Sequence, residues 1–78
     1  METQLLSEHL HIERKQFFFD LKENPRGRFL KITEDVGGRR DTIIIPSTGL
    51  EQFREMVGKA IEADHATASV TSATESAL

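Results

Sequence analysis

The sequence predicts an α+β domain in which a four-stranded antiparallel sheet is followed by one helix. Three observations carry this prediction. Segments with apolar residues at every second position fill the chain up to Ile45, turn-forming residues separate them, and one apolar stripe of helical period follows. The links between the segments are too short for crossovers, so we expect antiparallel neighbours. Strands followed by a helix are typical of the α+β class.

The first two strands are expected over residues 5–12 and 16–22. In the first, Leu6, Leu10 and Ile12 share one parity, and Glu8 interrupts the alternation. In the second, QFFFDLK, Phe18 shares the parity of Asp20 and Lys22, and the other parity is wholly apolar. Its apolar face consists of Phe17, Phe19 and Leu21.

The third and fourth strands are expected over residues 28–33 and 41–45. Residues 23–27 contain the Asn, Pro and Gly of a turn, and Gly37-Gly38 marks the next one. The fourth strand is expected to stop at Pro46, which cannot donate to a sheet ladder. In these two strands, the apolar residues expected on the same face of the sheet as Phe19 are Leu30, Ile32, Ile43 and Ile45.

A helix is expected after Pro46. Ser47 or Thr48 suits its N-cap, and Glu51 stands where a capping box with Thr48 needs it. The helix carries an apolar stripe at three- and four-residue steps, formed by Leu50, Phe53, Val57 and Ile61. Residues 64–78 are mostly Ala, Ser and Thr, which bury too little surface to offset ordering entropy. We therefore expect a domain over residues 1–63 and a disordered tail over 64–78.

A chain of 78 residues forms one small domain that needs reinforcement. It has no cysteine, which removes disulfides and thiolate zinc sites, and three histidines are too few for a structural metal. A partner subunit is the reinforcement left. No signal peptide or membrane span is visible, so we expect a cytoplasmic protein. No catalytic motif occurs, and we expect no enzymatic activity, cofactor or small-molecule substrate.

The charge is unevenly distributed along the chain. The net charge is -3, but residues 14–40 hold eight basic and four acidic residues, which is 8 − 4 = +4. If the helix covers the face of the sheet that carries Phe19, the opposite parity looks outward. It holds Phe18, Lys22, Phe29, Lys31 and Ile44, with His9 and His11 nearby. Rings beside cations suit single-stranded nucleic acid. The alternative is that a subunit or a second helix covers these apolar residues.

The stretches KQFFFDLKEN (residues 15–24) and GRFLKI (residues 27–32) resemble the PUR repeat of the purine-rich-element-binding proteins. The resemblance extends over residues 2–62. It implies a Whirly-like ββββα repeat that intertwines with a second copy, each helix packing on the partner's sheet. Eukaryotic members carry several repeats and bacterial members carry one. The single repeat here therefore implies a homodimer with an intertwined core of Phe17, Phe19, Leu21, Leu30, Ile32, Ile43, Ile45, Leu50, Phe53, Val57 and Ile61.

The resemblance also implies binding to single-stranded DNA or RNA, often purine-rich, in the regulation of gene expression, with nucleoid association as one setting. At the position of Glu13 relatives carry an amide, which bears on the purine preference. The nucleic-acid-binding residues are expected to be Arg14, Lys15, Phe18, Lys22, Asn24, Arg26, Arg28, Phe29 and Lys31. The alternative function is a protein-interaction or structural dimer that has lost nucleic-acid binding. The acidic net charge and Glu13 favour that alternative.

Overall fold

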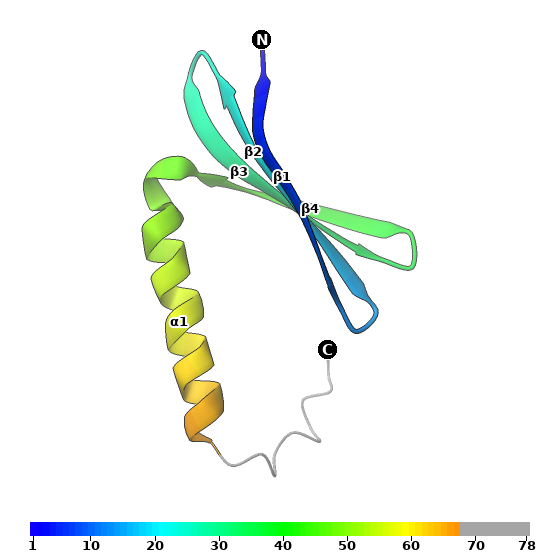
Figure 1. Cartoon of the computed structure of the whole chain (residues 1–78), viewed down its shortest axis with the longest axis vertical. Coiled ribbons are helices and arrows are strands. Elements are labelled where there is room, and N and C mark those ends of the chain that lie inside the picture. Colours follow the sequence, from blue (N-terminus) through cyan, green and yellow to red (C-terminus); the bar gives the residue numbers. More distant parts are fainter. Residues whose placement is uncertain (68–78) are drawn as a thin grey trace.

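The computed structural model describes residues 1–67, which form a four-stranded antiparallel sheet followed by helical segments (Figure 1). The strands are β1 (Thr3–Ile12), β2 (Lys15–Asn24), β3 (Gly27–Val36) and β4 (Arg39–Pro46). A short 3-10 helix, η1 (Ser47–Gly49), leads into α1 (Leu50–Ala66). The strands lie in the sheet in their chain order. The predicted ββββα fold is confirmed, and every strand is longer than expected. In β2, β3 and β4 backbone pairing continues to the turns, and β1 pairs with β2 from Thr3 onward.

All three hairpins close through two-residue turns. The last paired residues before and after the turns are Ile12 with Lys15, Asn24 with Gly27, and Val36 with Arg39. Gly37 and Gly38 have φ values of 61° and 92°, the positive pair that a type I′ turn requires. Turns this short set the register of the strands that they join, and so decide which side chains lie opposite each other across the sheet. Between β1 and β2 this register holds from Ile12 back to Leu6 and shifts by one residue between Leu6 and Gln4.

The β1–β2 turn holds Glu13 at φ 54°, the only positive φ of a non-glycine residue within residues 1–67. A β-carbon in this region costs about 1–2 kcal/mol. We expect Glu13→Gly to raise the free energy of unfolding by about 0.5–1 kcal/mol, after the entropy cost of glycine is subtracted. Urea denaturation at fixed protein concentration measures this change. Glu13→Gln removes the same charge but keeps the β-carbon, so equal stability of the two variants would contradict the strain.

The register divides the strand side chains between two faces of the sheet. We call them the Phe19 face and the Phe18 face. The Phe19 face carries Leu6, Glu8, Leu10, Phe17, Phe19, Leu21, Leu30, Ile32, Ile43 and Ile45. The Phe18 face carries His9, His11, Phe18, Lys22, Phe29, Lys31, Thr33, Arg40, Thr42 and Ile44. This division matches the parity that the sequence predicts, and Glu8 lies directly opposite Phe19.

Helix α1 stands apart from the sheet of its own chain and joins it through η1 (Figure 1). No apolar side chain of residues 1–67 is buried. Ile43 on the Phe19 face is 53% exposed, and Val57 on the helix stripe is 47% exposed. Within residues 1–67 the chain's own helix therefore does not cover the Phe19 face. The chain leaves two apolar surfaces unpaired, because the η1 turn after Pro46 leads the helix away from the sheet.

The ends of α1 differ from the sequence prediction. Its N-cap is Gly49 and no side chain caps it, so the expected cap at Ser47 or Thr48 and the capping box with Glu51 are wrong. Residues 47–49 form the 3-10 turn instead. The helix runs to Ala66, three residues past the expected domain boundary at 63. The rest of the expected tail, residues 68–78, lies outside the described residues.

Neither helical segment in residues 1–67 combines the length and apolarity that a membrane crossing needs. Within that range, no three His, Cys, Asp or Glu side chains are grouped so that they could hold a metal ion.

Candidate nucleic-acid interface

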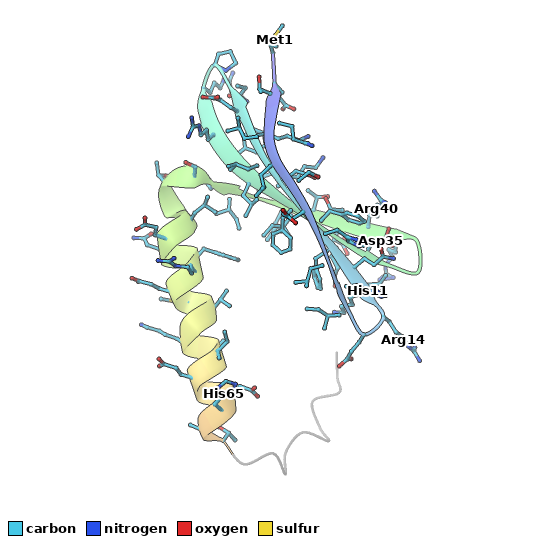
Figure 2. All side chains as sticks on the ribbon, viewed as in Figure 1. Met1, His11, Arg14, Asp35, Arg40 and His65 are labelled. Atoms are coloured by element: carbon cyan, nitrogen blue, oxygen red, sulfur yellow. The ribbon has the colours of Figure 1, made fainter. Side chains whose placement is uncertain are left out.

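The structure brings five of the nine expected binding residues together and places the other four elsewhere. The five lie on the Phe18 face, on the two central strands, and they are Phe18, Lys22, Asn24, Phe29 and Lys31. Arg14 lies in the β1–β2 turn and projects from its tip (Figure 2), and Arg26 lies in the β2–β3 turn. These two turns are at opposite ends of β2, so the arginines mark both ends of the Phe18 face.

Lys15 and Arg28 lie on the Phe19 face, on the opposite side of the sheet from Phe18 and Phe29. Lys15 Nζ is 3.0 Å from Glu34 Oε2, and Arg28 Nε is 3.4 Å from Glu23 Oε2. Ion pairs between side chains this exposed are weak and open readily. Their position on the sheet is the stronger constraint, because the backbone layer separates both cations from any ligand on the Phe18 face.

The ring of Phe18 is already in contact with two other side chains. His9 from β1 stacks on it with ring centroids 4.6 Å apart and an angle of 6° between the planes. Arg40 from β4 places its guanidinium carbon 5.4 Å from the Phe18 centroid. A base could reach this ring only by displacing one of these neighbours. Phe18 is therefore less available for stacking with a base than its position on the outward face of the sheet suggests.

Phe29 is the second ring of the Phe18 face, and it is half-buried. It lies opposite Lys22 on β2 and opposite Pro46 on β4. Within residues 1–67 it has no stacked aromatic and no cation over its ring. A free ring beside a lysine is an arrangement that single-stranded nucleic acid uses, since bases stack on the ring and the cation meets a phosphate.

Asn24 combines a structural and a free group at the β2–β3 turn. Its Oδ1 accepts a hydrogen bond from the backbone N–H of Arg26 at 2.8 Å. Because the oxygen is used in the turn, the two N–H donors of the side-chain amide are the part that can meet a ligand. Asn24 is thus placed to hold the turn and to donate at the end of the Phe18 face.

The cations of the Phe18 face outnumber its acids. Its strand positions carry Lys22, Lys31 and Arg40 against Asp20 and Asp35, which is 3 − 2 = +1. Lys31 makes no ion pair with any residue of 1–67. Lys22 Nζ is 3.8 Å from Glu2 Oε1, near the limit of a contact. The face therefore offers two lysines that are free or weakly held, although the whole chain is acidic.

Two residues of the Phe18 face that contact the Phe18 ring, Arg40 and His9, were not among the expected binding residues. Arg40 donates through Nε to Asp35 Oδ2 at 2.9 Å, and the two lie side by side in Figure 2. The Gly37-Gly38 pair was the sequence signal that could have placed Arg40 on the Phe18 face, because a two-residue hairpin turn there puts Arg40 opposite Asp35. For His9 the signal was the β1–β2 register, which sets it opposite Phe18.

Comparison with known proteins identifies relatives of the chain. A family described as PurA ssDNA and RNA-binding protein matches residues 1–77. "Transcription factor Pur-alpha 1" of Arabidopsis thaliana is 51% identical over 55 residues, covering 70% of this chain and 19% of that protein. Human "Transcriptional regulator protein Pur-beta" is 41% identical over 63 residues, with 78% and 20% covered. Human "Transcriptional activator protein Pur-alpha" is 40% identical over 65 residues, with 74% and 20% covered. The chain thus spans about a fifth of these relatives.

Proposed function

This chain belongs to the PurA family of single-stranded DNA- and RNA-binding proteins, and from that premise we propose that it binds single-stranded nucleic acid through the Phe18 face. The observation that carries the proposal is the ring of Phe29, which no aromatic or cationic side chain of residues 1–67 covers, opposite Lys22 and on the same face as Lys31. The family is one of nucleic-acid-binding proteins and not of enzymes. Since the named relatives regulate transcription, we propose a role in the regulation of gene expression.

In this proposal a base stacks on Phe29 and the neighbouring phosphates meet Lys22 and Lys31. Stacking of one base on an aromatic side chain contributes about 1–3 kcal/mol. A duplex hides both faces of each base in its own stack, so the strand must be single to use the ring. Arg26 lies in the β2–β3 turn, three residues before Phe29, and is placed to meet the nucleic-acid backbone where it leaves the sheet.

We further propose that the binding unit is a homodimer. Each chain has an exposed apolar stripe on α1 and an exposed Phe19 face, and neither is covered by another part of residues 1–67. A second copy of the chain buries both surfaces when the helix of each chain packs on the Phe19 face of the other. This arrangement leaves both Phe18 faces open to nucleic acid, so the two requirements are compatible.

The test is a titration of labelled single strands of about 20 nucleotides, longer than the site of one small domain. Purine-rich strands and their duplexes are compared as DNA and as RNA at several salt concentrations, with solution mass measured in parallel. We expect a dimer that prefers single strands, with affinity falling as salt rises. A dimer that binds none of them would contradict the proposal and favour a protein-interaction role.

The cations of the Phe18 face predict a change in salt dependence. We expect Lys31→Ala and Lys22→Ala each to weaken binding and to reduce the slope of log K against log salt by about 0.7, the share of one phosphate contact on a single strand. Lys15→Ala is the control, because Lys15 lies on the Phe19 face beside Glu34. A larger change in slope for Lys15→Ala than for Lys31→Ala would place the phosphates on the other face.

A further inference from the structure

Three side chains from three strands form a layered stack on the Phe18 face. His9 of β1 lies parallel to Phe18 of β2 at 4.6 Å, and Arg40 of β4 lies 5.4 Å from the same ring. Ring stacking and cation–π contact each stabilise such an arrangement. The stack is therefore a built feature of the face and not a chance contact between mobile side chains.

Hydrogen bonds fix the orientation of the outer members of this stack. His9 Nε2 is 3.0 Å from Gln16 Oε1, and Arg40 Nε is 2.9 Å from Asp35 Oδ2. Both partners are on the central strands of the sheet. A ring held in this way loses little side-chain entropy when a ligand stacks on it, which favours binding.

The outer face of the imidazole is the accessible end of the stack. β1 is an edge strand, and His9 is exposed. Phe18 occupies one face of the imidazole, and no aromatic ring or cation in residues 1–67 occupies the other. An exposed, oriented aromatic plane at a sheet edge has the properties of a stacking platform for a nucleobase.

We infer that the outer face of His9 is a second base-stacking position, in addition to Phe29. This inference rests on the proposed binding of single strands by the Phe18 face. Phe18 and Lys22 are the register partners of His9 and Phe29, and they are four residues apart on β2. The two positions are thus about 13 Å apart along the strands and about 10 Å apart across them. A single nucleic-acid strand that occupies both positions would use two bases that are not adjacent in its sequence.

The decisive variant is His9→Trp. The chain has no tryptophan and no tyrosine, so the introduced indole is the only such fluorophore. We expect saturation with a single-stranded oligonucleotide to quench its emission several-fold, because a stacked base quenches indole directly. His11→Trp is the matched control, since His11 is on the same edge strand and face but lies opposite Gln16 without a ring beneath it. We expect its quenching to be much smaller.

Affinity measurements on further variants separate stacking from a structural role. His9→Ala is expected to weaken binding at least about fivefold, the lower end of the stacking range, without changing the salt slope. His9→Phe keeps an aromatic plane and is expected to bind like wild type. Circular dichroism and solution mass confirm that each variant keeps the fold and assembly of wild type.

The outcomes distinguish this inference from the proposed function. Failure of the wild type to bind any single strand overturns both. If the wild type binds, the inference is overturned by unchanged affinity of His9→Ala, or by equal quenching of the two tryptophan variants. In either case binding through Phe29 and the lysines still stands. Loss of affinity in His9→Phe equal to that in His9→Ala also overturns it, because stacking would then not be the reason.

Discussion

Phe53→Asp is expected to convert the proposed homodimer into a largely unfolded chain. Phe53 lies on the apolar stripe of α1 and is 40% exposed in the single chain, so the proposed partner must cover the rest. Losing a buried phenyl ring costs about 3–5 kcal/mol, and a carboxylate in its place adds a desolvation penalty. A domain this small has roughly 5–15 kcal/mol in total to lose. Solution mass and far-ultraviolet circular dichroism measure the two consequences.

A matched variant shows whether burial is the cause. Gln52→Asp introduces the same charge one position earlier, on the polar side of the helix, and is expected to remain a folded dimer. Ile43→Asp, on the Phe19 face, is expected to behave like Phe53→Asp because the two surfaces are proposed to pack together. If Phe53→Asp stayed folded as a monomer, the proposed exchange of helices between two copies would be wrong.

Phe29→Ala is expected to lower affinity for single strands by about 5- to 150-fold, which corresponds to the loss of about 1–3 kcal/mol of base stacking. Phe29 is the ring of the Phe18 face without an aromatic or cationic partner in residues 1–67. Fluorescence anisotropy of a labelled oligonucleotide at fixed salt measures the change. The salt slope should stay constant, because no phosphate contact is removed.

Ile44→Ala is the control for this prediction. Ile44 is an apolar residue on the same face, 54% exposed and on the neighbouring strand β4. Its truncation removes apolar surface but no ring, so affinity should change less than twofold. Phe29→Trp should keep the affinity. If Ile44→Ala and Phe29→Ala lost affinity equally, general apolar contact rather than stacking would explain binding.

Phe18→Ala provides a contrast within the same face. Its ring supports His9 and contacts Arg40, so we expect its removal to act through the position of His9. The loss of affinity should then resemble that of His9→Ala. In this proposal the two phenyl rings of the Phe18 face have different roles: Phe29 is a platform, and Phe18 is the layer beneath the platform of His9.

Local patterns determined most of the fold. Alternation of apolar residues fixed the strands and the two faces, because successive side chains in a strand point to opposite sides of a sheet. The Gly37-Gly38 pair fixed the β3–β4 turn, since a type I′ turn needs two positive φ values. The apolar stripe fixed the helix. The start of the helix was wrong, because residues that suit an N-cap also suit a 3-10 turn.

The candidate site was only partly predictable from the sequence. Parity correctly grouped Phe18, Phe29 and the two lysines, but their charge and their match to the PUR repeat also assigned Lys15 and Arg28 to the binding surface. The structure places these two on the Phe19 face, beside Glu34 and Glu23. Composition shows that a segment is basic, whereas the register decides which face each cation occupies.

By itself, the sequence determined the order of the elements, the two faces of the sheet and the family to which the chain belongs. Only the tertiary structure decided that His9 and Arg40 flank Phe18, and that α1 leaves the Phe19 face of its own chain uncovered. The physical reason is the range of the interactions. Strand parity and turn chemistry act between residues close in the chain, whereas side-chain stacking across strands and the packing of a helix depend on residues far apart in it.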